Sequence, residues 1–425
     1  MCLPAFLVIR LREIIQVPNI YHPVHTKVMT MAKLLFRLTI ICLLGFLVSC
    51  KNSKLSAQSD LWVTGYYAGW QQGNENSGYL PAQNIDFSAV TLINHFALVP
   101  KPDGTVDDAP NGVTASNAQA LVPAAHAAGK KVVIAVGGWG SDASFRGATS
   151  PANLSAFVSN LVSLMRARGY DGIDIDWEVL APSDADQYIA FVTSLRASLD
   201  NISPKPLLTA ATQWEPGVFA TLADKFDQIN IMTYDFSGAW PGWVTWHNAA
   251  ILDGGLNFPN TDRLVPSANK MVDEFVNAGV PAEKIGIGID FYGYVWSGGE
   301  GLPDGGATGP RQSWTAPPTV QSNIPYYTIM KDYYQEQYAR WDSSAQASYL
   351  CIDNPGSADD KFVSYDNPMT CKMKINYAHS KGIGGVIIWE LGGGYQANNP
   401  PGQRDILLQA VKKAVQESKK PPEQK

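Results

Sequence analysis

Three acidic residues recur at every second position of one short apolar segment. Asp174, Asp176 and Glu178 alternate there with two isoleucines and a tryptophan. Because successive side chains of a β-strand point to opposite faces, this spacing places the acids on one face and the apolar residues on the other. Carboxyl groups buried beside one another have raised pKa values, and one that stays protonated near neutral pH can serve as a general acid. The segment therefore predicts a buried strand that carries a general acid, in preference to a solvated acidic face.

The acidic segment lies within a regular alternation of strand and helix patterns. Apolar runs predict eight strands, at residues 62–67, 90–98, 131–136, 172–177, 207–211, 228–232, 285–291 and 385–389. Amphipathic stretches predict helices between them, such as residues 116–128, 151–168, 185–199, 269–278 and 372–380. Strands that alternate with helices form parallel βα units, and eight such units close into a barrel. The predicted fold is α/β, a (β/α)8 TIM barrel.

One connection is too long to be a loop. Residues from about 293 to 366 separate the seventh strand from the helix before the eighth, and a structureless loop of that length is uncommon inside a compact domain. The pattern predicts a helix at 326–341 and strands at 348–352 and 361–365. We therefore expect an α+β insertion between strand 7 and helix 7.

Aromatic residues gather at the predicted strand ends, where barrels of this kind place their functional side chains. The residues at these ends are Tyr66, Phe96, Trp139, Glu178, Met232, Tyr234, Asp235, Tyr292 and Trp389. Rings around an acidic centre suit stacking against sugar faces, although core packing accounts for most aromatic residues in any protein. The glycine-rich run 136–140 has no Lys or Ser/Thr pattern of a phosphate loop. These ends predict a carbohydrate cleft.

Composition argues against several other classes of function. The chain has 425 residues and a net charge of −6, and its charges are scattered with no basic stripe, so we expect no nucleic-acid partner. The histidines and cysteines show no spacing typical of a metal site. We expect no metal, no organic cofactor and a monomeric chain.

The amino-terminal segment has the pattern of an export signal. From Met31 a short basic region leads into an apolar run that closes on Leu-Val-Ser-Cys at Cys50. This ending resembles a bacterial lipobox, in which the cysteine is lipidated and becomes the first mature residue. The apolar run is shorter than the ~20 residues that a membrane span needs. We expect an exported lipoprotein of a bacterial cell envelope, in the outer membrane or periplasm or released from the cell, that touches the membrane only through Cys50.

These patterns divide the chain into four parts. Residues 1–50 are the extension and signal, with Met29 or Met31 the natural start, and residues 51–60 are a polar tether. The barrel with its insertion covers residues 61–416, and residues 417–425 form a solvated tail. Cys351 and Cys371 remain in the mature domain, and an exported protein could join them in a disulfide.

Residues 171–178 resemble the Asp-Gly-x-Asp-x-Asp-x-Glu signature of glycoside hydrolase family 18, the chitinases and their relatives. Residues 232–235 resemble the Met-x-Tyr-Asp motif of the sixth strand in that family. Residues 285–293 and 384–391 are similar to its seventh and eighth strands. The resemblance extends from about Trp62 to Glu390 and includes the insertion.

The resemblance implies a role for each acidic residue. Glu178 would be the general acid and then the base, with no enzymic nucleophile, because this family is an exception to the two-carboxylate scheme. The acetamido oxygen of the substrate would attack instead, oriented by Asp176 and by Tyr234. Asp174 would share a proton with Asp176. The opposite parity of Asp171 indicates a structural role at the strand entry.

The resemblance also implies the substrate-binding set and its substrates. Trp389 would form the floor of the site, and the lining would comprise Tyr66, Phe96, Gly138, Trp139, Met232, Asp235 and Tyr292. The expected ligand is chitin or N-acetylglucosamine oligosaccharides. A chitinase that cleaves β-1,4 bonds is the first hypothesis. An endo-β-N-acetylglucosaminidase acting on N-glycan cores is the second, and a non-catalytic lectin is the third.

The chain departs from the family pattern at two positions. The third-strand motif usually has Ser at the position of Ala135. The alanine lacks the hydroxyl group that would hydrogen-bond the aspartates. After the seventh strand the family often has Arg, and this chain has Tyr294. That arginine contributes to sugar binding in relatives, so the second departure bears on the affinity for sugar.

Overall fold

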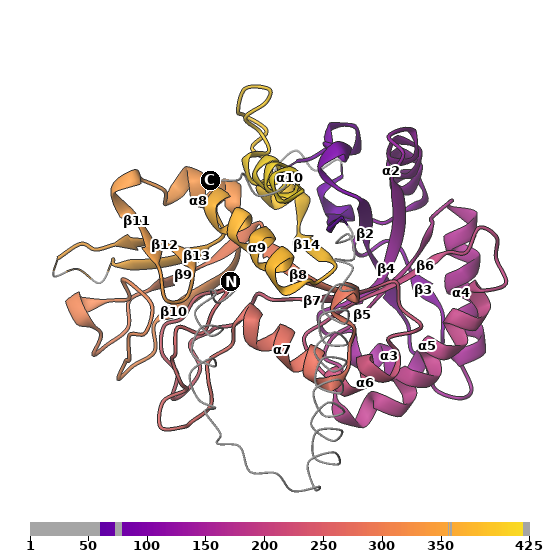
Figure 1. The fold of residues 1–425 in the computed structure, drawn as a ribbon, viewed down its shortest axis with the longest axis horizontal. Coiled ribbons are helices and arrows are strands. Elements are labelled where there is room, and N and C mark those ends of the chain that lie inside the picture. Colours follow the sequence, from indigo (N-terminus) through magenta and orange to yellow (C-terminus); the bar gives the residue numbers. More distant parts are fainter. Residues whose placement is uncertain (1–59, 73–78, 356, 358, 420–425) are drawn as a thin grey trace, which may run out of the picture. The chain divides into compact units, whose positions relative to one another are not determined.

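The computed structural model describes residues 60–72, 79–355, 357 and 359–419 (Figure 1). The predicted signal, the lipidation site Cys50, nearly all of the tether and the end of the tail lie outside these residues.

Eight parallel strands form a closed barrel, as predicted. Their order in the sheet is β1-β14-β8-β7-β6-β5-β4-β2, and β1 pairs with β2 to close it. A two-residue strand, β3 (Val106–Asp107), adds to β2 in antiparallel fashion. The barrel strands are β1 (Trp62–Ala68), β2 (Leu92–Pro100), β4 (Lys131–Gly138), β5 (Gly172–Trp177), β6 (Leu207–Thr212), β7 (Gln228–Ile231), β8 (Ile285–Asp290) and β14 (Gly385–Trp389).

Helices surround the barrel (Figure 1). In α7 the side chains of Met271, Val272 and Phe275 are buried on one face, Ser267 caps the amino end and Gly279 ends the helix at φ 108°. The helices are α2 (Ala115–Ala127), α3 (Asp142–Ala148), α4 (Leu154–Ala167), α5 (Ala185–Leu199), α6 (Pro216–Thr221), α7 (Ala268–Ala278), α9 (Pro368–Lys381) and α10 (Ile406–Ser418). Helix α10 extends to Ser418, so the predicted tail begins within a helix.

The insertion between β8 and α9 is a five-stranded antiparallel sheet with one short helix. Its strand order is β10-β9-β13-β12-β11. The elements are β9 (Tyr292–Ser297), β10 (Thr319–Pro325), α8 (Tyr326–Asp332), β11 (Ala339–Asp342), β12 (Ala347–Ile352) and β13 (Lys361–Tyr365).

The helix expected at 326–341 is wrong beyond Asp332. The segment continues into a 3-10 turn and then into β11, which pairs with β12 as a hairpin. Asp342 stabilises this hairpin turn, because its Oδ1 accepts hydrogen bonds from the backbone N–H groups of Ser344 and Ala345. A local turn and a cross-strand partner thus override the helical pattern.

The expected disulfide between Cys351 and Cys371 is not formed, because Cys371 is a free and fully buried thiol. Cys371 lies on α9 beside the charges of Asp366 and Lys374. Cys351 lies on β12, where it is opposite Phe362 of β13. The two cysteines therefore belong to different surroundings, one on a helix and the other in the sheet of the insertion. Among the described residues, no helix has the length and apolar character needed to span a bilayer.

Candidate active site

The acidic face of β5 points into the barrel. Its Asp174 is opposite Ala135 of β4 and Thr209 of β6. Asp174 and Asp176 are buried, and Glu178 is half-buried just beyond the strand end. On the other face Trp177 stacks on Phe145 with ring centroids 4.6 Å apart. The alternation predicted from the sequence is therefore confirmed, with the acids inside and the apolar residues against the helices.

Asp174 is held by two hydroxyl groups from other strands. Tyr66 of β1 donates to its Oδ2 at 3.1 Å, and Thr209 donates to its Oδ1. Burial raises the pKa of Asp174, and these bonds oppose the rise because they favour the ionised form. The hydroxyl that Ala135 cannot supply from one neighbouring strand thus comes from Thr209 on the other.

Asp176 and Glu178 form a coupled pair of carboxyl groups. Each side chain shifts the pKa of the other, so the two groups titrate as a pair. Burial, and then the charges of Glu178 and Asp174, raise the pKa of Asp176 well above its usual range. Its buried Oδ1 accepts no hydrogen bond, which leaves an acceptor for a donor that enters the site.

Glu178 has the pKa of a group that works near neutral pH. Burial, followed by the charge of Asp235, raises its pKa to about 7, while the bond to Asp176 acts in the opposite direction. The loop after β4 holds the backbone of Glu178. The Glu178 carbonyl accepts the N–H of Asp142 at 3.2 Å, and Ser141 Oγ lies 3.4 Å from the Glu178 N–H. Glu178 is therefore positioned by the loop of the neighbouring strand β4.

Tyr234 lies beside these carboxyl groups. Its pKa is raised by burial and then by the charges of Asp235, Asp176 and Glu178. Gln213 holds the backbone here, donating to the carbonyls of Met232 and Tyr234 at 2.7 Å each.

The ring of Tyr234 lies so close to β8 that position 288 must be a glycine. A Cβ at Gly288 of β8 would lie 2.5 Å from Tyr234 Cε1. Only a residue without a side chain leaves room for the ring there.

Two phenols meet on Asp235. Tyr292 donates to its Oδ1 at 2.6 Å and Tyr294 donates to the same oxygen at 2.8 Å. The residue is exposed in the site, yet protein atoms surround its carboxyl group closely enough that burial raises its pKa, against the two phenol bonds. The contact of Tyr294 was not predicted, although its spacing of two from Tyr292 on one strand could have indicated it.

An aromatic cluster adjoins the carboxyl groups. Trp389 lies with its ring centroid 4.6 Å from that of Phe96 and 5.6 Å from that of Tyr66. Trp70, which the sequence reasoning missed, lies 6.3 Å from Trp389 and is 39% exposed. The position of Trp70 directly after β1 could have indicated that it belongs with the other aromatic residues at the strand ends.

The loop after β4 carries a second aromatic residue outward. Gly138 has φ 105°, and a Cβ there would lie 2.8 Å from the Phe96 ring, so the glycine permits both the turn and the close approach. Trp139 follows it and is 79% exposed. Trp240, in the loop after β7, is 49% exposed. Rings this exposed contribute little to the core and can contact a ligand.

Glu390 is a further acidic residue that the sequence reasoning did not single out. Its Oε1 accepts a hydrogen bond from Gln71 Nε2 at 3.1 Å, and its Oε2 accepts from the N–H of Gly392 at 2.9 Å. Burial raises its pKa to about 7. The bond joins the ends of β1 and β14, beside Trp70 and Trp389.

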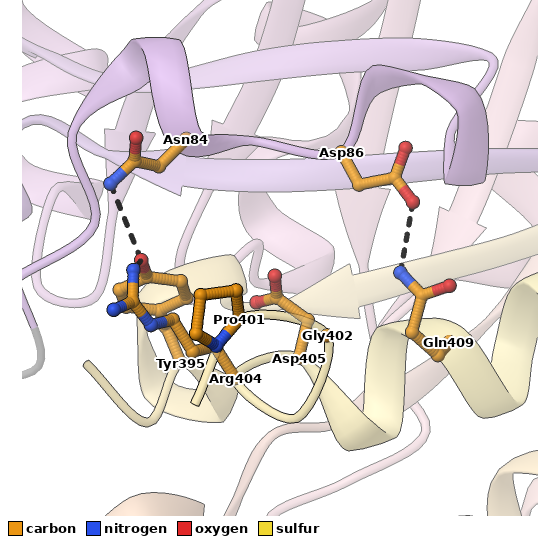
Figure 2. Close-up of a pocket in the computed structure, with 8 residues that line it drawn as sticks. All are labelled: Asn84, Asp86, Tyr395, Pro401, Gly402, Arg404, Asp405 and Gln409. Carbon is orange, nitrogen blue, oxygen red and sulfur yellow. Dashed lines mark hydrogen bonds between the residues drawn. The ribbon is translucent and has the colours of Figure 1, made fainter. Parts of the chain in front are cut away.

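The predicted acidic residues and the aromatic cluster around Trp389 lie apart from a polar pocket of about 440 Å³ at the start of α10 (Figure 2). That pocket contains none of them. Bonds from Asn84 to Tyr395 and from Gln409 of α10 to Asp86 cross it and join the chain after β14 to the segment before β2. Within the described ranges, no cluster of three or more His, Cys, Asp or Glu side chains could hold a metal ion.

The chain is similar in sequence to known chitinases. Chitinase A1 of Niallia circulans is 32% identical over 295 residues, which are 62% of this chain and 40% of that protein. Chitinase 1 of Aphanocladium album is 29% identical over 275 residues, 61% of each protein. The chain therefore covers between 40% and 61% of the length of these two relatives.

Solved structures share the fold. The group IV chitinase of Ostrinia furnacalis in complex with allosamidin has a TM-score of 0.69 at 22% identity, over 84% of this chain and 100% of that one. The group II chitinase catalytic domain 2 of the same species has a TM-score of 0.69 at 21% identity, over 86% and 98%. The sequence model described as glycosyl hydrolases family 18 matches residues 63–394. Because that match spans most of the chain, the protein belongs to glycosyl hydrolase family 18.

Proposed function

We propose that the protein is a chitinase, which hydrolyses β-1,4-linked N-acetylglucosamine polymers with retention at the anomeric carbon. The observation that carries this proposal is the pairing of Glu178, whose pKa is about 7, with Asp176. A protonated Glu178 near neutral pH is suited to donate a proton to a glycosidic oxygen.

The reaction has two steps. In the first, the acetamido carbonyl oxygen of the substrate attacks the anomeric carbon while Glu178 gives its proton to the leaving oxygen, which breaks the glycosidic bond and leaves an oxazolinium ion. In the second, water attacks the same carbon and displaces the acetamido oxygen, which restores the acetamido group, while Glu178 takes a proton from that water. Two displacements at one carbon retain its configuration.

Asp176 and Tyr234 are placed to act on the acetamido group. The buried Oδ1 of Asp176 has no hydrogen-bond partner, so it can accept the amide N–H and orient the attacking oxygen. The pKa of Tyr234 is raised by burial, so its hydroxyl remains a hydrogen-bond donor. Both residues would stabilise charge that develops as the bond breaks.

The aromatic residues support a polymeric sugar substrate. The rings of Trp389 and Trp70 lie 6.3 Å apart beyond the ends of β14 and β1, and the exposed rings of Trp139 and Trp240 come from the loops after β4 and β7. In strand order β5 and its carboxyl groups lie between β4 and β7, so the loops of Trp139 and Trp240 flank them, which favours sugar units bound on both sides of the cleavage point. This arrangement supports chitin or its oligomers over a single small sugar.

Product analysis tests the proposal. Residues 51–425 and their Glu178→Gln variant are incubated with chitin oligomers and, separately, with an N-glycosylated protein, followed by mass spectrometry. Glu274→Gln, on the exposed face of α7, is the matched control. Shortened oligomers from the wild type and the control alone support a chitinase. Released glycans with intact oligomers would assign the glycan-core activity, and binding without turnover would assign a lectin.

We also propose that lipid on Cys50 attaches the protein to a bacterial envelope. The support is the sequence Leu-Val-Ser-Cys after an apolar run. Expression of the full chain in a bacterium with labelled palmitate tests it. Label in the wild type and none in Cys50→Ser is the expected result, and equal labelling of both would contradict the anchor.

A further inference from the structure

Tyr294 reaches the active site from the insertion. It lies on β9, two residues after Tyr292, so both side chains leave the strand on the same face. Strand β9 is held by β10 on one edge and by β13 on the other, where Tyr294 is opposite Ser364. Only 9% of Tyr294 is exposed. Its hydroxyl is therefore carried by a rigid strand and is directed at Asp235.

The backbone of Asp235 is fixed as well. Its backbone N–H donates to Asn248 Oδ1 at 3.2 Å, and the residue has φ 57°. Asn248 in turn donates from Nδ2 to Asp290 at 2.7 Å and from its backbone N–H to Ser364 Oγ at 2.8 Å. Because the backbone is held in this way, the carboxyl group of Asp235 has little freedom to move toward other hydrogen-bond donors.

We propose that Tyr294 is a positioning residue: its hydroxyl fixes the carboxylate of Asp235 as an ion beside Glu178, and it thereby governs the proton of the general acid. This inference rests on the proposed function, because it concerns the same acid. It assigns to the insertion a direct influence on the chemistry of the barrel.

The electrostatics of the neighbouring groups support this assignment. Burial and the charge of Asp290 raise the pKa of Asp235, while the bonds from Tyr292 and Tyr294 lower it. The charge of Asp235 in turn raises the pKa of Glu178. Tyr234, the residue before Asp235, is a buried phenol whose raised pKa keeps it neutral. The ammonium group of Lys374 is paired with Asp290. Loss of one phenol bond therefore favours neutral Asp235 and lowers the pKa of Glu178.

The position of Tyr294 also accounts for the departure from the family pattern. An arginine there would add a positive charge, which by itself favours ionisation of nearby carboxyl groups. A phenol stabilises the charge of Asp235 through a hydrogen bond and adds no charge. Tyr294 thus keeps Asp235 negative without favouring proton loss from Glu178.

The test is a double-mutant cycle read as pH profiles of kcat/KM on a chitin oligomer. The set comprises the wild type, Tyr294→Phe, Asp235→Asn and the double variant. We expect Tyr294→Phe to move the basic limb to lower pH, and Asp235→Asn to move it further. We expect no added effect of Tyr294→Phe in the Asp235→Asn background, because the charge it sustains is then gone. An unmoved limb in Tyr294→Phe, or an equal shift in both backgrounds, would overturn the proposal.

Tyr326→Phe is the matched control. Tyr326 is a buried phenol of α8 whose ring stacks on Tyr365, within the same insertion. Its loss should leave the pH profile unchanged. If Tyr294→Phe does not fold, replacement of Tyr294 by 3-fluorotyrosine keeps the shape and strengthens the donor, so the basic limb should move to higher pH. A fluorinated protein with the wild-type limb would also overturn the proposal.

A second readout separates this inference from the proposed function. Titration of the Glu178 carboxyl carbon by NMR, in protein without substrate, requires no turnover. A lower pKa of Glu178 in Tyr294→Phe supports the positioning role even if chitin oligomers prove not to be the substrate. An unchanged titration alongside normal chitin cleavage overturns the inference and leaves the proposed function intact.

Discussion

Lys374 Nζ of α9 lies 3.2 Å from Asp290 Oδ1 at the end of β8, and both side chains are completely buried. The same ammonium group also bonds Asp366, which follows β13 at the end of the insertion. Asp366 accepts the backbone N–H of Asp290 at 3.3 Å. One cation thus joins the two connections through which the insertion leaves and re-enters the barrel. Charges this deep are tolerated only as a set, because each alone would be an unpaired ion away from water.

Removal of the cation should therefore destabilise the protein strongly. We expect Lys374→Met to reduce the free energy of unfolding by about 3–5 kcal/mol, since Asp290 and Asp366 lose their partner. A neutral triple variant that adds Asp290→Asn and Asp366→Asn should recover much of this loss. Denaturant unfolding measures both. As a control, Lys381→Met breaks an exposed pair with Asp273 and should cost less than about 1 kcal/mol. A wild-type midpoint for Lys374→Met would contradict this interpretation.

The pH dependence of activity should report Glu178. Because burial raises its pKa to about 7, the protonated form needed for the first step is lost as pH rises through that value. We expect kcat/KM to fall about tenfold per pH unit above this limb. The measurement is the rate on a soluble chitin oligomer between pH 4 and 9. Activity that stays level to pH 9 would show that proton transfer from Glu178 does not limit the reaction.

The same raised pKa implies that Glu178 lowers stability at alkaline pH. The folded protein binds its proton more tightly than the unfolded chain does, so stability falls as pH rises from the usual carboxyl range to about 7 and stays lowered above it. Glu178→Gln should therefore be more stable than the wild type at pH 8 by about 1–2 kcal/mol, a value reduced for partial exposure. At pH 4 the two should unfold alike. A difference that is independent of pH would point to packing instead of charge.

A hydroxyl group at position 135 should replace that of Thr209 as a hydrogen-bond donor to Asp174. Thr209→Val removes a donor from buried Asp174 and should cost about 1–3 kcal/mol in stability or activation free energy. Ala135 is opposite Asp174 on the other neighbouring strand. Ala135→Ser in the Thr209→Val background should then restore part of the loss, measured by thermal unfolding and kcat/KM. Equal losses with and without the new serine would show that its hydroxyl does not reach Asp174.

Trp139 should contribute to binding and not to folding. With 79% of the residue exposed, Trp139→Ala should leave the unfolding temperature unchanged. Loss of one stacking surface should raise KM for long oligomers by roughly tenfold, about 1–1.5 kcal/mol. The comparison is Trp177→Ala, whose buried ring packs on Phe145 and whose loss should cost about 3–5 kcal/mol of stability. Unchanged KM in Trp139→Ala would place this ring outside the sugar path.

Local periodicity was sufficient to predict the elements and their faces. The strands Gly172–Trp177 and Gly385–Trp389 have the predicted bounds, because alternating or continuous apolar patterns record burial directly. Asp171 behaves as its parity indicated, since its Oδ2 accepts the N–H of Val132 at the strand entry. The row of three acids and the position of the insertion could likewise be predicted, because each depends on residues close together in the chain.

Contacts between distant residues could not be read in this way. The split of 326–341 into α8 and β11 depends on a partner strand, and the absent disulfide depends on where a helix and a sheet place two cysteines. Thr209 reaches Asp174, and Gln71 reaches Glu390 across 319 positions of sequence, only because the barrel closes. The sequence by itself determined which side chains enter the barrel. The tertiary structure alone decided which hydroxyl or cation each buried carboxyl group meets, and those partners control how readily it ionises.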